Sequence, residues 1–188
     1  INYAGNTAAA EDTKKRIEAA GGRAVLARGD VADPAAVKGM FDIAEKEFGG
    51  ADVLVNNAGV FQPMPLKDST DDLFDRHFDI NVKGTFNGMR EAATRLNKGG
   101  RIVNFSTSVT GTKMENYSVY GATKAAVEIM TAIFAKELRG TGTTVNCVAP
   151  GPTGTDLFLE GKSEDLIDRL AKMSPMVRLG TPGDVAAV

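Results

Sequence analysis

The sequence predicts an α/β fold in which a doubly wound parallel sheet carries helices on both faces within a single domain. Short apolar runs alternate with longer segments of helical periodicity, and this alternation is typical of a parallel sheet. Glycine and proline residues separate most of these segments, as turn signals do. A chain of 188 residues is long enough to bury a sizeable core and corresponds to about one domain.

Five short segments have the composition of strands. Residues 1–3 read as the end of one strand, and residues 23–28 form a second, short one. Residues 52–55 are apolar after the first position, as in a strand that is buried on both faces. Residues 101–105 and 143–148 follow, and the latter are rich in β-branched side chains.

Helices fill the intervals between these strands. The segment 7–20 ends at a pair of glycines, which is a common stop signal. Asp33 and Pro34 begin the helix that continues to residue 48, as N-cap and first-turn residue. Further helices are expected over residues 69–96, 117–138 and 163–172, and a last one begins at residues 182–184.

Small polar and turn residues directly follow three of the strands. They are Asn56-Asn57-Ala58-Gly59, Ser106-Thr107-Ser108 and Pro150-Gly151, in chain order. Ligands of an open α/β sheet bind at the carboxyl ends of its strands. We therefore expect these three segments to contribute to one shared site.

Tyr120 and Lys124 lie four residues apart in the helix 117–138. This spacing places both side chains on one helix face, where an ammonium is expected to lower the tyrosine pKa from its ordinary value of ~10. Ser108, twelve residues before the tyrosine, could hold a carbonyl or alcohol oxygen against it. The group predicts proton transfer to or from such an oxygen, with a cofactor to move the hydride. The alternative is an ordinary surface pair.

The composition excludes several functional classes. Lys and Arg number 22 and Asp and Glu 24, so the net charge of −2 does not indicate a nucleic-acid or anionic-membrane partner. No apolar run could span a bilayer, and no signal peptide is recognisable. The single Cys147 suits a reducing compartment, and we expect a cytoplasmic protein. His77, the only histidine, is expected on a solvated helix face, and no metal site is predicted.

An ordered set of motifs resembles the short-chain dehydrogenase/reductase family, and it extends over essentially the whole chain. The motifs are Asp30-Val31, Asn56-Asn57-Ala58-Gly59, Asn81 in Asn-Val-x-Gly, Ser108, Tyr120-x-x-x-Lys124 and Pro150-Gly151-Pro152-Thr153-Gly154-Thr155. The resemblance is to members like 3-oxoacyl-[acyl-carrier-protein] reductase. It implies a Rossmann-type fold and an NAD(P)-dependent oxidoreductase that interconverts a carbonyl and a secondary alcohol.

The resemblance also implies a role for each of four catalytic residues. Tyr120 would donate a proton to the carbonyl oxygen, and Lys124 would lower the tyrosine pKa and bind the nicotinamide ribose. Ser108 would position the substrate oxygen, although Thr107 satisfies the spacing of many relatives, which is one residue longer. Asn81 would hold a water behind Lys124, whereas its own sequence context indicates a residue at a helix kink.

A dinucleotide cofactor is implied by the same resemblance. An acid at the end of the family's second strand would bind a ribose 2′-hydroxyl, and residues 3–6 contain none. This absence favours NADP, with NAD still possible. The implied cofactor-binding residues are Tyr3, Asp30, Val31, Asn57, Ala58, Gly59, Tyr120, Lys124, Pro150, Gly151, Thr153 and Thr155.

Two departures from the family pattern concern the ends of the sequence. The glycine-rich turn after the family's first strand is absent, and so is the last strand beyond Val188. The first strand lies in the middle of the family's sheet, so that without it the sheet would divide between the second and fourth strands. We therefore expect residues 1–188 to form a partial dinucleotide-binding domain that includes the catalytic residues.

Apolar segments on two loops indicate where a substrate would bind. Residues 157–159 (Leu-Phe-Leu) would form a lid, and residues 60–66 a second wall, unless both simply pack against the body. By resemblance, the candidate substrates are a 3-oxoacyl thioester, which ranks first, a sugar or polyol, and a small cyclic ketone.

Small residues on two helices bear on assembly. Gly84 and Gly88 share one helix face, and Ala122, Ala125 and Ala126 lie on the next helix. Family members pair these helices, so a homotetramer is predicted, with burial inside one chain as the alternative. The sequence also leaves open a non-catalytic dinucleotide-binding subunit of the same fold.

Overall fold

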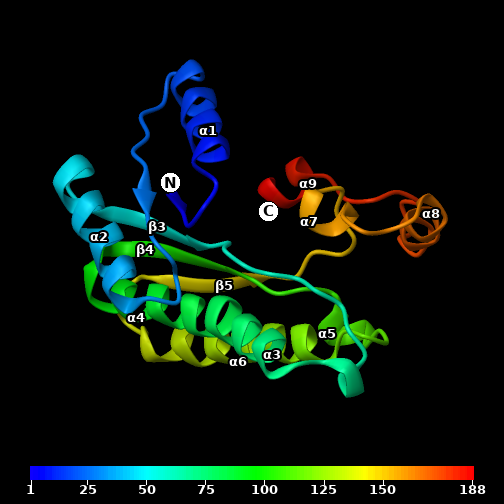
Figure 1. Ribbon diagram of the computed structural model, residues 1–188. Helices are drawn as coiled ribbons and strands as arrows, with labels where there is room; N and C mark the ends of the chain where they lie inside the picture. Colours follow the sequence, from blue (N-terminus) through cyan, green and yellow to red (C-terminus); the bar gives the residue numbers. More distant parts are fainter.

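A computed structural model describes residues 1–188 and places a three-stranded parallel sheet at the centre of the fold (Figure 1). Its strands are β3 (Ala51–Asn56), β4 (Leu96–Phe105) and β5 (Thr144–Val148), in the order β3-β4-β5. The register pairs Asn56 with Asn104 and Phe105 with Val148. The carboxyl ends of all three strands therefore meet at one edge, as the sequence predicted.

The remaining two strands form a separate parallel pair. They are β1 (Asn2–Tyr3) and β2 (Ala27–Arg28), and no hydrogen bond joins them to β3. The strand expected over residues 23–28 is thus shorter than predicted. The sheet divides where the sequence analysis expected it to divide. Beside the division, Val53 and Val55 of β3 leave more than half of their surface exposed, 55% and 54%.

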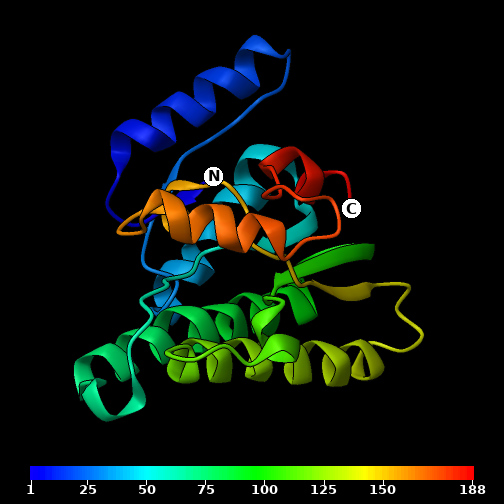
Figure 2. The same cartoon turned by 90° about the vertical axis from the view of Figure 1, so that its right-hand side faces the viewer.

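Local capping signals define the helices around these strands. α1 (Thr7–Ala19) is capped by Asn6, and Gly21 follows it with a φ of 83°. α2 (Pro34–Phe48) begins at Asp33, whose carboxylate accepts a hydrogen bond from the Ala35 N–H at 2.9 Å. In both views α1 lies away from the central sheet (Figures 1 and 2).

Two long helices cover one face of the central sheet (Figure 1). One is α4 (Gly84–Arg95) and the other is α6 (Ser118–Glu137). The predicted helix over 69–96 is in fact α3 (Asp71–His77), a π-helix labelled η2 (Phe78–Lys83) and then α4. A short 3₁₀ turn, η1 (Leu66–Asp68), precedes them.

The glycines of α4 face the interior of the chain. An alanine Cβ at Gly84 would lie 2.5 Å from Cγ2 of Val31, and one at Gly88 would lie 2.3 Å from Oδ1 of Asn56. Both glycines therefore allow α4 to approach neighbouring segments of the same chain, which was the alternative to helix pairing between copies. Ala122 and Ala125 of α6 are exposed.

The core contains an apolar cluster and a buried polar connection. The cluster includes Phe41, Met89, Ile102 and Val145, from α2, α4, β4 and β5. Beside it, Nδ2 of Asn56 donates to Oδ1 of Asn104 at 2.8 Å, and Nδ2 of Asn104 donates to Oγ1 of Thr131 at 2.8 Å. These bonds join β3, β4 and α6, and they satisfy amides that would be costly to bury alone.

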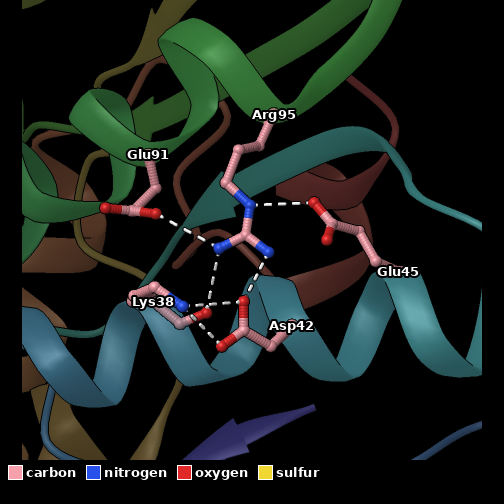
Figure 3. Close-up of polar contacts among 5 residues, drawn as sticks. All are labelled: Lys38, Asp42, Glu45, Glu91 and Arg95. Carbon is pink, nitrogen blue, oxygen red and sulfur yellow. Dashed lines mark hydrogen bonds and ion pairs between the residues drawn. The ribbon is translucent and has the colours of Figure 1, made fainter.

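Arg95 ties α4 to α2 through a group of carboxylates (Figure 3). Its guanidinium lies 2.6 Å from Asp42 and 2.8 Å from Glu45 of α2, and 3.3 Å from Glu91 of α4. The hydrogen bond to Glu45 is the largest cause that raises the pKa of Arg95. The pKa of Asp42 is lowered, first by its hydrogen bond with Lys38 and then by Arg95.

The segment that follows β5 lies on the opposite side of the sheet from α4 and α6 (Figures 1 and 2). It contains α7 (Asp156–Leu159), α8 (Glu164–Lys172) and α9 (Pro182–Ala186), while α5 (Val109–Thr112) follows β4. None of the helices combines the length and apolar character that a membrane crossing requires.

Candidate active site

Tyr120 and Lys124 lie on α6, one turn apart, at the edge where the three strands end. Lys124 is only 7% exposed, and its Nζ donates a hydrogen bond to the carbonyl oxygen of Phe105 at 2.9 Å. The same Nζ lies 5.9 Å from the centre of the Tyr120 ring. The pair is therefore buried and oriented, unlike an ordinary surface pair.

Burial shifts the pKa of both residues. It lowers the pKa of Lys124 from 10.5 to about 8, because the ammonium loses its hydration inside the protein. It raises the pKa of Tyr120, and a hydrogen bond with the Thr107 side chain offsets part of that rise. The expectation that Lys124 would lower the tyrosine pKa is thus wrong, because burial of the phenol raises that pKa and Lys124 is not among the groups that lower it.

Two hydroxyls follow β4, and they lie in different surroundings. Thr107 is buried, and its side chain lowers the pKa of Tyr120 against the effect of burial. Ser108 is half-buried, and its hydroxyl has no hydrogen-bond partner in the protein. An alanine Cβ at Gly151 would lie 3.9 Å from Oγ of Ser108, so this hydroxyl lies beside the end of β5. It is free to bind a ligand oxygen.

Asn81 lies in the π-helix η2, and its side chain is completely buried. Its Oδ1 accepts the N–H of Val60 at 2.8 Å, and its Nδ2 donates to the Val60 carbonyl and to Oγ1 of Thr123. The amide thus connects the loop after β3 to α6. π-helical turns recur at functional sites. The water-holding role of Asn81 stays a prediction.

The predicted cofactor residues near β3 border a cavity of about 250 Å³, whose lining includes Val31, Asn57 and Ala58. Gly59 lies next to this group, and an alanine Cβ there would lie 3.2 Å from Oδ1 of Asn81 and 3.7 Å from Nζ of Lys124. The absence of a side chain at Gly59 therefore leaves room beside the lysine, as a group bound at this point requires.

The other predicted cofactor residues lie near the β1–β2 pair or after β5. Tyr3 and Asp30 lie at the β1–β2 pair and are not part of the cavity lining; Asp30 accepts the N–H of Ala32 at 2.9 Å. Pro150 accepts the N–H of Ser108 at 2.9 Å, which places the turn after β5 directly at the catalytic group. Thr153 and Thr155 follow, and Thr155 is the N-cap residue of α7.

Arg28 is a residue that the sequence analysis missed. It lies in β2 opposite Tyr3, and its Nε donates to the Ala4 carbonyl at 3.3 Å. The sequence contained no arginine within the segment 3–6, and only the pairing of β1 with β2 brings this one beside it. A cation here favours a phosphate at the end of β1.

A cleft of about 770 Å³ lies next to the catalytic group, and one of its lining residues, Phe61, contacts Tyr120. Phe61, Tyr117, Leu157 and Lys162 are among the residues that line it, so both loops expected to bind substrate contribute. The Phe61 ring contacts the Tyr120 ring edge-on, with 4.9 Å between centroids, and lies 5.3 Å from the Tyr117 ring. Nζ of Lys162 lies 4.9 Å from the centre of the Phe61 ring. The wall next to the tyrosine is therefore aromatic.

His77 is buried, with 1% of its surface exposed, and the expectation of a solvated position was wrong. Its Nε2 accepts the N–H of Gln62 at 3.2 Å, so Nδ1 carries the proton and donates to the Leu73 carbonyl at 2.8 Å. The imidazole thereby fixes the loop that carries Phe61, and it has no free nitrogen for chemistry.

Comparison with known proteins identifies the family. Residues 1–188 match the family model described as Enoyl-(Acyl carrier protein) reductase. A short-chain type dehydrogenase/reductase of Picea abies is 45% identical over 196 residues, which cover 99% of this chain and 72% of that protein. The chain therefore belongs to the short-chain dehydrogenase/reductase family of NAD(P)-dependent oxidoreductases, as the ordered motifs predicted.

Two further relatives agree with this assignment. An NADPH-dependent aldehyde reductase-like protein of Arabidopsis thaliana, described as chloroplastic, is 41% identical over 199 residues, covering 98% of this chain and 74% of that protein. A short-chain dehydrogenase of Burkholderia cenocepacia J2315, solved in complex with NADP, superposes with a TM-score of 0.92 at 36% identity, covering 100% of this chain and 76% of that one. The Rossmann-type fold is thereby confirmed.

Proposed function

We propose that this protein is an NADPH-dependent reductase of aldehyde or ketone carbonyls, with Asn81, Ser108, Tyr120 and Lys124 as its catalytic residues. The observation that carries this proposal is the burial of Lys124 beside Tyr120 at the strand edge, where Ser108 keeps a free hydroxyl. An ammonium that pairs with no carboxylate costs stability, and a site that must bind and polarise a ligand explains why it is there.

Each side chain would contribute one step to the reduction. Ser108 would hold the carbonyl oxygen by donating a hydrogen bond, and Tyr120 would donate its phenolic proton to that oxygen. The nicotinamide supplies the hydride to the carbonyl carbon when it is bound. Lys124 would then favour the phenolate that the proton transfer leaves on Tyr120, because its positive charge lies on the same helix face.

The cofactor would lie along the strand edge. Asn57, Ala58 and Gly59 leave room for it, and Arg28 would bind the 2′-phosphate that distinguishes NADP from NAD. The NADP-bound Burkholderia structure and the NADPH-dependent Arabidopsis relative support the same choice. The other members of the proposed set are Tyr3, Asp30, Val31, Tyr120, Lys124, Pro150, Gly151, Thr153 and Thr155.

Two substrate classes are compatible with the cleft. A 3-oxoacyl thioester would extend along the apolar residues of the lid, such as Leu157. An aryl aldehyde or aryl ketone is favoured by a specific observation, the contact of the Phe61 ring with Tyr117 and Tyr120. Aromatic rings at these separations can accept a further ring edge-on or in an offset stack.

We also propose that residues 1–188 are a partial dinucleotide-binding domain that includes the catalytic residues, in a protein that forms a homotetramer in the cytoplasm. Support for assembly comes from apolar side chains on the outer surfaces of α4 and α6. Phe86 is 43% exposed, Ile129 63% and Ile133 51%. Large apolar side chains that are exposed in this way are costly in water, and they support an interface on these two helices.

The test is a titration followed by turnover. NADPH and NADH are titrated separately while nicotinamide fluorescence is recorded, and the NADPH complex is then supplied with acetoacetyl thioester, 4-nitrobenzaldehyde and hexanal. Tight binding of NADPH with turnover of one carbonyl class is the expected result. Binding without any turnover would overturn the catalytic proposal in favour of a non-catalytic dinucleotide-binding subunit.

Tyr120→Phe provides the decisive variant. It removes the proton donor but keeps the aromatic ring, so we expect kcat to fall by about 10²–10⁴-fold while the Kd for NADPH changes little. Full turnover by this variant would exclude Tyr120 as the proton donor.

A further inference from the structure

Glu128 forms an unusual contact between α6 and the turn that carries Ser108. It lies one turn after Lys124 on α6, and its side chain is half-buried. Its Oε1 accepts a hydrogen bond from Oγ of Ser106 at 2.5 Å and another from Oγ1 of Thr110 at 2.8 Å. Two hydroxyls on opposite sides of Ser108 are thus bound to a single carboxylate oxygen.

No ion pair of the structure includes Glu128. Its contacts within the chain are with hydroxyls, and hydrogen bonds to a charged acceptor are shorter and stronger than those between neutral groups. A carboxylate with these partners neutralises no positive charge, but its hydrogen bonds hold the residues that donate them in place. We infer that the turn over residues 106–110 is the part whose position it fixes.

Ser108 depends on that turn for its orientation. Its backbone N–H donates to the Pro150 carbonyl at 2.9 Å, which fixes one side of the residue to the turn after β5. Its hydroxyl has no partner in the protein, so no side-chain contact holds it. The contacts of Ser106 and Thr110 with Glu128 therefore supply the constraint from the side of α6, the helix that also carries Tyr120.

We propose that Glu128 is a positioning residue for the reaction, which sets the distance between the Ser108 hydroxyl and the Tyr120 phenol. The proposal rests on the function proposed above, since it concerns the same carbonyl oxygen. Tyr120, Lys124 and Glu128 are spaced by four residues, so one helix face would hold the proton donor, its cationic neighbour and the support of the serine.

The test is a double-mutant cycle measured by NADPH oxidation with 4-nitrobenzaldehyde. Glu128→Ala is made in the unsubstituted protein and in the Ser108→Ala background. If Glu128 acts through Ser108, we expect Glu128→Ala to lower kcat about 10-fold or more in the otherwise unsubstituted protein. In the Ser108→Ala background the same substitution should lower kcat by less than about twofold. The Kd for NADPH is expected to change little, because the hydrogen bonds of the Glu128 carboxylate are with Ser106 and Thr110, which are not among the proposed cofactor residues.

Two further variants keep the test informative if Glu128→Ala folds poorly. Glu128→Gln keeps the side-chain volume and an acceptor oxygen, so it should recover most of the kcat. Thr110→Val removes only one of the two hydroxyls and should give an intermediate loss. Glu137→Ala, at the exposed end of the same helix, is the matched control and should leave kcat unchanged.

Each contrary result has a distinct meaning. Equal losses in both backgrounds, or a loss of unfolding free energy with unchanged kcat, would overturn the positioning role and leave the proposed function intact. If the unsubstituted protein turns over none of the tested carbonyls with NADPH, the proposed function is overturned, and the role of Glu128 with it.

Discussion

Burial of Lys124 predicts that the active site destabilises the folded protein at neutral pH. The folded-state pKa is about 8, whereas the ordinary value is 10.5. At pH 7 the lysine is charged in both states, and the difference corresponds to a cost of about 3 kcal/mol in unfolding free energy. The cost shrinks as pH rises above 8, because the folded protein then releases the proton before the unfolded chain does. It disappears above the unfolded-state pKa.

Lys124→Met isolates this effect. The methionine fills a similar volume without a charge, but it leaves the Phe105 carbonyl unpaired at a cost of about 1–3 kcal/mol. That loss does not depend on pH, because a neutral amine also donates a hydrogen bond. The unfolding free energy of Lys124→Met minus that of the unsubstituted protein should therefore fall by about 2 kcal/mol between pH 7 and pH 9.5.

The assay is urea unfolding followed by far-UV circular dichroism, since the chain contains no tryptophan. Burial raises the pKa of Tyr117 and Tyr120, so these groups weaken the fold as pH rises, but they are present in both proteins and cancel in the difference. Lys136→Met, exposed on the same helix, should give a difference that does not depend on pH. A constant difference for Lys124→Met as well would refute the reasoning.

Four further substitutions test the packing, the cofactor choice and the ion pairs. Gly88→Ala should lower the unfolding free energy by about 1–2 kcal/mol, because displacing Asn56 breaks a buried hydrogen bond that outweighs the helix propensity of alanine. Gly39→Ala, in open space in α2, should instead raise it by about 0.5–1 kcal/mol, and urea unfolding measures both. Arg28→Gln should weaken NADPH binding by about 10–100-fold and leave NADH binding unchanged in fluorescence titrations; equal losses for both would exclude a phosphate contact. Arg95→Leu should lower the melting temperature at low salt, and by less in 1 M NaCl, whereas a salt-independent loss would indicate packing alone.

The order of helices and strands could be predicted because its signals are local. Asp33 and Pro34 specify the start of α2 through bonds within a single turn, and the structure begins that helix at Pro34. The glycine with positive φ after α1 is likewise a property of one residue. The meeting of Asn57, Ser108 and Gly151 at one edge followed from the direction of parallel strands, which requires no knowledge of side-chain packing.

The misjudged residues depend on contacts between distant segments. His77 is surrounded in sequence by aspartates, yet its ring points to the Gln62 N–H, fifteen residues earlier. Arg28 lies beside Ala4 only because β1 and β2 pair. The pKa of Tyr120 depends on how deeply α6 is buried, and neither the spacing to Lys124 nor the identity of its neighbours specifies that depth.

Residues that stabilise the fold also differ from residues of the candidate site in what their burial does to the free energy of folding. Residues such as Ile102 and Val145 are buried where burial stabilises, and their pattern can be recognised from periodicity alone. Lys124 is buried where burial costs free energy, and Ser108 keeps a hydroxyl without a partner. Most positions of the sequence carry residues that stabilise the fold, whereas Lys124 and Ser108 do not. This difference is consistent with a site that binds a ligand oxygen. Removing the lysine should then make the unfolding free energy less dependent on pH and abolish turnover. The stability and the activity measurements therefore test the same explanation for the burial of Lys124.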